Sequence, residues 1–290
     1  MAKLGVITDG ISRDFEHALK VMAQAGLDYA ELQYLWDKQV GELDEAELGR
    51  VRELLGRYGM KVSCISRHIF VGIGMGDIEV GDAVHAGQME YLRRCIAMAH
   101  DFGTKLVRVM SGRKEMIIFG KNGAEVWNAS VGAWEKLIAI LEPAVKLAES
   151  EDITLVVETG NNAMITSCWL GRKLIDDLGT RNLKVLWDPA NSLYCAEAPY
   201  PDGYESLRGG HLGHVHIKDS VVDIPKATVR QCAIGTGQMA PYLRDMAAAF
   251  AADGYDGVIS LENVYRPDGG TFEDGFQANV GPFKKIFGQA

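Results

Sequence analysis

Strand-like and helix-like segments alternate along the whole of this 290-residue chain. Short apolar and β-branched runs are followed by amphipathic stretches that stop at Gly26, Gly59, Gly103 and Gly254. Glycine directly after such a stretch is typical of a helix C-terminus, because it adopts the left-handed conformation without steric cost. The pattern predicts strands over 3–8, 29–33, 61–66, 105–110, 154–158, 183–188, 213–218 and 257–262. It predicts helices over 14–25, 46–58, 85–102, 132–150, 170–178, 240–252 and 279–287, and a short helical stretch near 204–207.

Eight strands with intervening helices in a chain of this length are typical of a (β/α)8 TIM barrel, an α/β fold. We expect one domain over 1–290, because no low-complexity linker, composition break or charge block divides the chain. The alternative is an open, doubly wound sheet. That fold normally carries a glycine-rich nucleotide-binding segment after its first strand, and Thr8-Asp9-Gly10-Ile11-Ser12 does not supply one.

Charge and cysteine usage narrow the classes of partner. Lys and Arg number 30 against 39 Asp and Glu, a formal net charge of −9, whereas nucleic-acid binding normally leaves a basic footprint. The five cysteines are scattered without Cys-x-x-Cys spacing, which favours reduced thiols in a cytoplasmic protein. The amino terminus runs straight into a strand pattern, and no apolar stretch approaches the roughly 20 residues of a membrane span. We therefore expect a cytoplasmic protein without nucleic-acid or membrane partners.

Four of the predicted strands in the second half end in a side chain that can bind a metal. These residues are Glu158, Asp188, His216 and Glu262. In a closed parallel barrel the strand ends share one mouth, so the four groups should converge. The three carboxylates give this cluster a net charge of about −3, so it would repel itself unless a divalent cation held it together. A single such residue is ordinary, but four on successive strands predict a metal centre.

Longer segments around these residues resemble a known family. Val157-Glu158-Thr159-Gly160-Asn161, Trp187-Asp188-Pro189-Ala190-Asn191, His214-Val215-His216-Ile217-Lys218-Asp219 and Ser260-Leu261-Glu262-Asn263 are similar to segments of the xylose isomerase-like TIM-barrel superfamily, and more narrowly of its sugar-phosphate isomerase/epimerase branch. Ile234-Gly235-Thr236-Gly237 resembles the family's Gly-x-Gly segment, with Gln238 where that family often has an acidic residue.

The resemblance implies that Glu158, Asp188, His216 and Glu262 bind one divalent metal ion, Mn²⁺ first, with Mg²⁺, Co²⁺ or Zn²⁺ also possible. Strand alternation places His214 and His216 on the same face, so geometry alone does not choose between them. The family pattern favours His216, which leaves His214 in the core or as a supporting group. The resemblance also implies a small carbohydrate substrate and assembly as a homodimer or homotetramer.

Sugar isomerisation or epimerisation removes a proton next to a carbonyl, and a metal stabilises the resulting enediolate. Glu158 and Glu262 are the predicted base/acid pair; the alternative is that both are ligands alone. Asn191, Lys218, His68 and Arg266 are the predicted substrate-binding residues. For Lys218, an ion pair with Asp219 or a neighbouring carboxylate is an equally weighted alternative. We expect Arg108 to point into the barrel and to bond Glu158 or Glu31.

Different activities fit the same pattern of residues. A lyase or dehydratase acting on keto-sugars or inososes would begin with the same proton abstraction and then expel a neighbouring group. An endonuclease IV-like nuclease would need further metal ligands and a basic groove, which the net charge of −9 disfavours. A sugar-binding barrel without catalysis is the fourth hypothesis. Ile217-Lys218-Asp219-Ser220 differs from the ketose 3-epimerase pattern, which ends in an arginine, and is closer to the inosose-processing and sugar-phosphate epimerase members.

Overall fold

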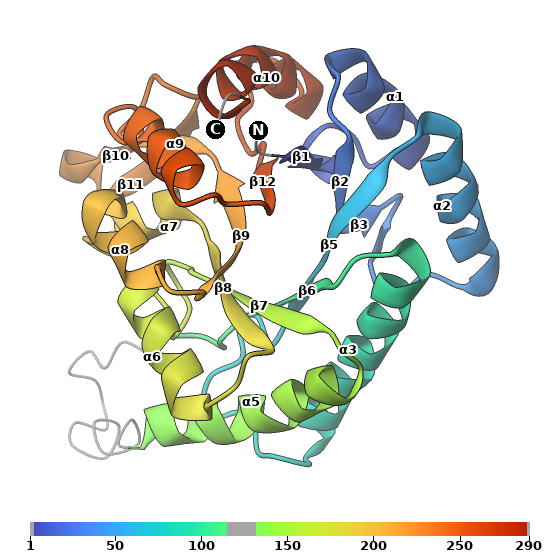
Figure 1. The fold of residues 1–290 in the computed structure, drawn as a ribbon, viewed down its shortest axis with the longest axis vertical. Helices are drawn as coiled ribbons and strands as arrows, with labels where there is room; N and C mark the ends of the chain where they lie inside the picture. Colours follow the sequence, from blue (N-terminus) through green and yellow to red (C-terminus); the bar gives the residue numbers. More distant parts are fainter. Residues whose placement is uncertain (1–2, 115–131, 289–290) are drawn as a thin grey trace.

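Parallel strands form a closed barrel in the computed structural model, which describes residues 3–114 and 132–288 (Figure 1). The order around the ring is β1-β12-β9-β8-β7-β6-β5-β2, and β1 closes it by pairing with both β2 and β12. The strands are β1 (Lys3–Ile7), β2 (Tyr29–Leu32), β5 (Lys61–Ile69), β6 (Leu106–Val109), β7 (Thr154–Glu158), β8 (Leu183–Trp187), β9 (Leu212–Ile217) and β12 (Val258–Leu261). The predicted (β/α)8 TIM barrel and its eight strands are therefore confirmed.

Helices surround the barrel (Figure 1). They are α1 (Phe15–Ala25), α2 (Glu45–Tyr58), α3 (Ala83–Phe102), α5 (Ala133–Ser150), α6 (Cys168–Leu178), α9 (Leu243–Ala252) and α10 (Phe272–Phe287), with the shorter α7 (Pro189–Tyr194) and α8 (Tyr204–Leu207). Gly26, Gly59 and Gly103 end α1, α2 and α3 with φ of 66°, 66° and 72°. These glycines adopt the left-handed conformation that their positions in the sequence predict.

The structure also contains elements that the sequence pattern did not predict. Two antiparallel hairpins follow barrel strands: β3 (Tyr34–Leu35) pairs with β4 (Lys38–Gln39) after β2, and β10 (Asp219–Asp223) pairs with β11 (Thr228–Cys232) after β9. Helix α10 begins at Phe272, seven residues before the predicted start. Its true start is marked by a capping box between Thr271 and Asp274, and Gly275 interrupts the apolar periodicity just after it.

The barrel interior has an apolar floor. Cys64, Val156 and Leu186 are fully buried and form a cluster of their own, against which Leu106 packs. Because side chains two residues apart on a strand face the same side, the residues that follow this layer on the same strands also face the interior. Those residues are Ser66, Arg108, Glu158 and Asp188. The fold thus places a layer of polar and charged groups directly above an apolar one.

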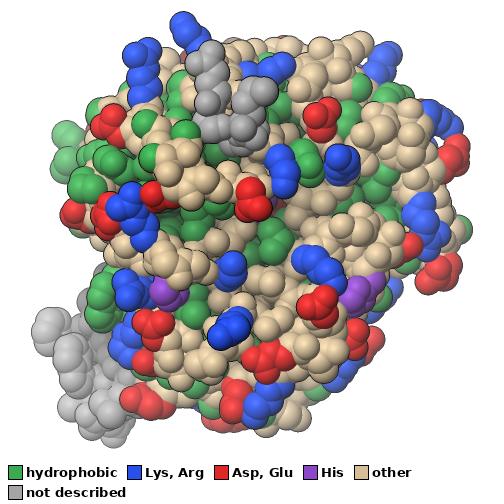
Figure 2. Space-filling model, in the orientation of Figure 1, with side chains coloured by type: hydrophobic (Ala, Val, Ile, Leu, Met, Phe, Trp, Pro, Cys, Tyr) green, Lys and Arg blue, Asp and Glu red, His purple; other side chains and the backbone are tan. Residues whose placement is uncertain are grey.

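The surface shows charges of both signs. On the face drawn in Figure 2, acidic and basic side chains are interspersed rather than gathered into one patch. No helix within residues 3–114 and 132–288 is both long and apolar enough to cross a membrane.

Helix α10 packs tightly against the segment that follows β12. Asn263 donates hydrogen bonds from Nδ2 to the carbonyls of Gly10 (2.6 Å) and Phe272 (2.8 Å), and its Oδ1 accepts one from Asn279 (2.9 Å). A Cβ on Gly275 would lie 1.9 Å from the carbonyl oxygen of Tyr265. Glycine at this position therefore allows the helix to approach the segment that directly follows Glu262.

We predict that G275A destabilises the protein by about 2 kcal/mol or more, because the backbone of Tyr265 must move away from the new methyl group. The matched control is G87A in α3, where a Cβ would meet nothing within 4 Å. There alanine should raise stability by about 0.5–1 kcal/mol, as in other exposed helix positions. Urea unfolding followed by circular dichroism measures both, and a G275A protein as stable as the wild type would contradict the packing described above.

Candidate metal centre

Four strand ends bring their side chains to one point at the barrel mouth. Glu158 ends β7, Asp188 follows β8, His216 lies near the end of β9, and Glu262 follows β12. Each offers a ligand atom, and these atoms all lie within 4.8 Å of one another. The four strands are neighbours around the barrel, and all four residues are buried except Glu262, which is partly exposed. The four residues predicted as metal ligands are thus brought together.

Asp188 is oriented by the short helix that it begins. Its Oδ1 accepts hydrogen bonds from the backbone amides of Ala190 (3.1 Å) and Asn191 (3.3 Å), which makes it the N-cap of α7. Its Oδ2 lies 2.5 Å from Lys218 Nζ but makes no hydrogen bond of good geometry with the described residues. One carboxylate oxygen therefore holds the backbone, and the other faces the centre, where it lies beside Lys218.

Glu158 is held by Arg108. The guanidinium donates from Nη1 to Glu158 Oε2 at 3.0 Å, and it also donates from Nη2 to Gln33 Oε1 and to the carbonyl of Ser66. Of the two predicted partners of Arg108, the one it contacts is Glu158. Burial alone would raise the pKa of Glu158, but Arg108 and His216 outweigh burial and hold that pKa well below its usual range.

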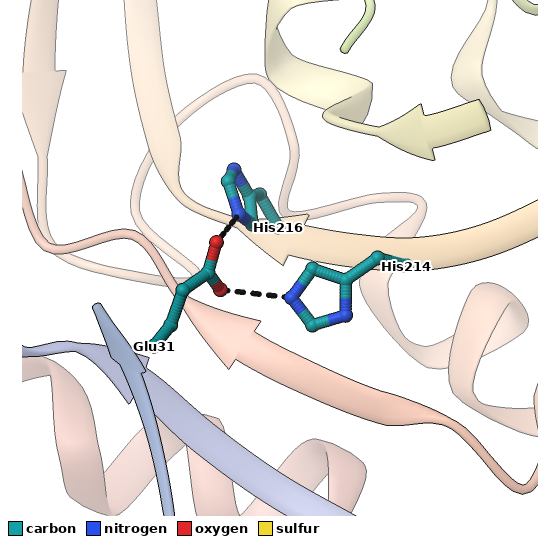
Figure 3. Close-up of side chains that lie close together, drawn as sticks. All are labelled: Glu31, His214 and His216. Carbon is teal, nitrogen blue, oxygen red and sulfur yellow. Dashed lines mark hydrogen bonds and ion pairs between the residues drawn. The ribbon is translucent and has the colours of Figure 1, made fainter. Parts of the chain in front are cut away.

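His216 lies between two carboxylates. Its Nε2 is 2.8 Å from Glu31 Oε1 (Figure 3). Its Nδ1 faces Glu158 Oε1 at 3.6 Å. His214, two residues earlier, donates to the other oxygen of Glu31 at 2.8 Å. Of the two histidines, His216 is the one that joins the group of four, as the family resemblance implied, while His214 lies fully buried beside Glu31.

The donor set suits a divalent cation. His216 Nδ1 is buried and has no hydrogen-bond partner in the part of the chain that the structure describes. A buried, unpaired ring nitrogen is costly, and a cation bound at this atom would remove that cost. Three carboxylates and one imidazole are ligands that Mn²⁺, Mg²⁺, Co²⁺ and Zn²⁺ accept to different degrees. The residues present therefore fit a single divalent ion.

Lys218 forms ion pairs within this group. Its Nζ lies 2.5 Å from both Asp188 Oδ2 and Glu262 Oε2. Burial disfavours the charge on Lys218, but Asp188 and Glu262 outweigh burial and raise its pKa. The structure thus contains the ion pair with neighbouring carboxylates, and Asp219 is not the partner. The carboxylate of Asp219 instead accepts hydrogen bonds from the backbone amides of residues 220, 235, 237 and 239.

The remaining predicted substrate residues, His68, Asn191 and Arg266, have different surroundings. His68 Nδ1 accepts a hydrogen bond from Gln39 Nε2 (2.8 Å), and burial together with the charge of Arg108 lowers its pKa to about 4, so the ring is neutral. Asn191 donates from Nδ2 to the carbonyl of Thr159 at 2.9 Å. Arg266 is exposed and lies over the ring of Phe272, outside the group.

Sequence reasoning gave Glu31 no role beyond a potential contact with Arg108. The signal for it exists, because Glu31 is a carboxylate within a predicted strand, as Glu158 is. The two hairpin residues around His68, Gln39 and Tyr34, carry no comparable signal. Their positions depend on β3 and β4, which are too short to show a strand pattern.

The sequence matches one protein family over most of its length. The model of the family described as Xylose isomerase-like TIM barrel matches residues 19–280. The chain belongs to this family. The match confirms the resemblance drawn from the strand-end segments. No curated protein matches this xylose isomerase-like chain in sequence.

Solved structures share the fold at low sequence identity. The structure of an L-ribulose 3-epimerase has a TM-score of 0.69 and 20% identity, with coverage of 100% of this chain and 95% of that chain. The structure of the IOLI protein with a bound zinc atom has a TM-score of 0.74 and 16% identity, with coverage of 99% of this chain and 98% of that chain. The structure of the probable 3-DHS dehydratase AsbF of Bacillus anthracis, involved in petrobactin synthesis, has a TM-score of 0.72 and 16% identity, with coverage of 97% of this chain and 98% of that chain. At these identities the likeness is one of fold, and it includes neighbours that are described as epimerases and as dehydratases.

We predict that metal binding at this centre releases protons and strengthens with pH. Burial opposes charge on His216, but Glu31 and Glu158 outweigh it and raise its pKa to about 10. Burial, assisted by Glu262 and Glu158 and opposed by Lys218, raises the pKa of Asp188 to about 7. Since a ligand must lose its proton to bind metal, affinity should rise up to about tenfold per pH unit for each proton released between about pH 6 and pH 8.5.

Calorimetric titration with Mn²⁺ in buffers of different ionisation enthalpy measures the protons released. An apparent binding enthalpy that does not depend on the buffer, together with a flat affinity over this pH range, would contradict the prediction.

Proposed function

We propose that this protein is a divalent-metal-dependent isomerase or epimerase that acts on a sugar or sugar phosphate by proton transfer through a metal-stabilised enediolate. The observation that carries the proposal is the convergence of Glu158, Asp188, Glu262 and the unpaired Nδ1 of His216 at the barrel mouth. Membership in the xylose isomerase-like family and the fold shared with an L-ribulose 3-epimerase support it.

Glu158, Asp188, His216 and Glu262 would hold one ion, Mn²⁺ first, with Mg²⁺, Co²⁺ or Zn²⁺ also possible. When bound, the ion supplies electrophilic stabilisation of the negative charge that develops on the substrate oxygens. The bound zinc atom in the IOLI structure, which shares this fold, supports the choice of a divalent ion.

Glu158 and Glu262 are the proposed proton-transfer pair. They come from β7 and β12, which are separated around the barrel by β8 and β9, so they approach the centre from different sides. Arg108 beside Glu158 and Lys218 beside Glu262 lower the two pKa values against the effect of burial. Both groups are therefore ionised at neutral pH, which is the state in which a carboxylate accepts a proton. One accepts the proton next to the carbonyl and later releases it to solvent water. The other first gains a proton from water and then returns it to the substrate from its own side.

Substrate binding is assigned to Lys218, His68, Asn191 and Arg266. Because Gln39 donates to His68 Nδ1, the neutral ring carries its hydrogen on Nε2 and can donate it to a substrate oxygen. Lys218 already lies among the ligands and is placed to meet a carbonyl oxygen or a phosphate. Arg266, on the exposed segment after β12, would contact only a substrate that extends from the centre.

A lyase or dehydratase acting on keto-sugars or inososes is the second candidate. It would use the same proton abstraction, and the fold shared with a probable 3-DHS dehydratase favours it over a nuclease or a sugar-binding barrel without catalysis. The two classes of enzyme differ in product, because elimination yields an unsaturated or dehydrated compound and isomerisation does not.

We predict that E158Q and E262Q each slow the exchange of substrate protons with solvent by about 10²–10⁴-fold, because glutamine cannot accept the proton. Deuterium uptake from D₂O, measured by mass spectrometry on a panel of ketoses, inososes and their phosphates, reports the exchange and identifies the substrate. Deuterium incorporation without elimination would favour the isomerase or epimerase over the lyase.

The matched control is E90Q, which removes an exposed carboxylate on α3 that pairs only loosely with Arg93 at 3.3 Å. E90Q should exchange protons at the wild-type rate. Chelation with EDTA should abolish exchange in the wild type, and added Mn²⁺ should restore it. Full exchange in either active-site variant, or exchange that survives chelation, contradicts the roles assigned above.

A further inference from the structure

Glu31 crosses the barrel interior to reach both histidines of β9. It lies on β2, and β1 and β12 separate that strand from β9 around the ring. Its Oε1 is 2.8 Å from His216 Nε2, and its Oε2 is 2.8 Å from His214 Nε2. Figure 3 shows the carboxylate between the two imidazoles, with one oxygen directed to each ring. All three side chains are fully buried.

These contacts fix which ring nitrogens point where. A carboxylate only accepts hydrogen bonds, so each Nε2 must carry a hydrogen and donate it to Glu31. With Nε2 of His216 occupied in this way, Nδ1 is the ring nitrogen left to face Glu158. Ser66 Oγ also donates to Glu31 Oε1, so the carboxylate accepts three hydrogen bonds, from Ser66, His214 and His216. The direction of Nδ1 therefore depends on a residue that does not belong to the group of four.

Glu31, His214 and His216 also lie close enough together to suggest a second metal group. The distances argue against a second cation. Both nitrogen–oxygen separations are 2.8 Å, which is the length of a charge-assisted hydrogen bond. A cation between these atoms would have to displace both hydrogens, in an interior where the three residues have no solvent exposure. The arrangement instead matches a carboxylate–histidine pair that supports a metal ligand from behind.

We propose that Glu31 is the positioning residue of the metal centre: it holds His216 with Nδ1 directed at Glu158, Asp188 and Glu262, and His214 braces Glu31 from the other side. This inference rests on the proposed metal-dependent function. His214 has a defined part in it, because without that imidazole Oε2 of Glu31 would be a buried, unpaired charged oxygen. Ser66 and His214 together keep the carboxylate from rotating.

The test is the metal affinity of E31Q, measured by calorimetric titration with Mn²⁺ and by competition with a chromogenic chelator. Glutamine keeps the shape of the side chain, but its amide nitrogen would meet an Nε2–H, so one imidazole must turn or change its protonated nitrogen. We expect a loss of about 10–100-fold in affinity, as for other groups that support a metal ligand. The matched control is E42Q, which removes a carboxylate that pairs with Arg67 at 2.8 Å but contacts none of the four ligands. It should bind Mn²⁺ as the wild type does.

A spectroscopic measurement separates positioning from a loss of stability. In wild-type protein loaded with Zn²⁺ and labelled with ¹⁵N-histidine, we expect His216 to bind the ion through Nδ1 and to keep its hydrogen on Nε2. In E31Q that signature should be lost or mixed. If E31Q does not fold, H214Q provides the same test from the other side of Glu31, with a measurable loss of affinity that is smaller than the loss of about 10–100-fold expected for E31Q.

The outcomes distinguish this inference from the proposed function. A wild type that binds no divalent metal would remove both. A wild type that binds Mn²⁺, with a folded E31Q or H214Q that binds it equally tightly and keeps the Nδ1 signature, would overturn the role of Glu31 and leave the metal centre intact. Weakened binding in E31Q with unchanged binding in E42Q supports the proposal.

Discussion

Closure of the barrel between β1 and β12 is the constraint on which the site depends. If that seam were open, the order of strands would put β2 and β9 near opposite edges of a single sheet. The contact between Glu31 and His216 would then be lost, although the local structure around each residue was unchanged. Closure also gathers the carboxyl ends of parallel strands into one mouth, where Glu158 and Glu262 meet despite their distance in the chain.

A buried concentration of carboxylates persists because each has a positive or donating partner. Arg108 on β6 pairs with Glu158, and Lys218 after β9 pairs with Asp188 and Glu262. The imidazoles of His214 and His216 pair with Glu31. Buried charges are tolerated when they are paired in this way, and each partner becomes costly to remove alone. These partners come from different strands and loops of the barrel, so the charges at the mouth are balanced only when the whole barrel is formed.

The sequence predicted the barrel and the four convergent residues because both follow from short-range signals. Apolar runs identify strands, and glycines such as Gly103 mark helix ends. In a parallel barrel, the side chains at the carboxyl ends of the strands all lie at the same mouth. The sequence narrowed the ion-pair partners of Arg108 and Lys218 to a few residues but did not choose among them. Lys218 pairs with Asp188 and Glu262. The carboxylate of Asp219 instead accepts hydrogen bonds from backbone amides in the loop at 235–239, a contact that the sequence pattern does not reveal. Glu31 was overlooked for a different reason. Its strand is distant in sequence from β9. The role of a carboxylate on a strand can be assigned only when its partner across the barrel interior is known.

The apolar layer of Cys64, Val156 and Leu186 lies beneath Ser66, Arg108, Glu158 and Asp188 on neighbouring strands. These three apolar side chains offer no oxygen to which a proton could pass, so on this side of the interior water and hydronium reach the charged groups from the mouth. A molecule bound at the mouth would therefore lie between these charged groups and bulk water. The time for which it stays there would influence whether a labile hydrogen remains with its carbon framework or exchanges with solvent.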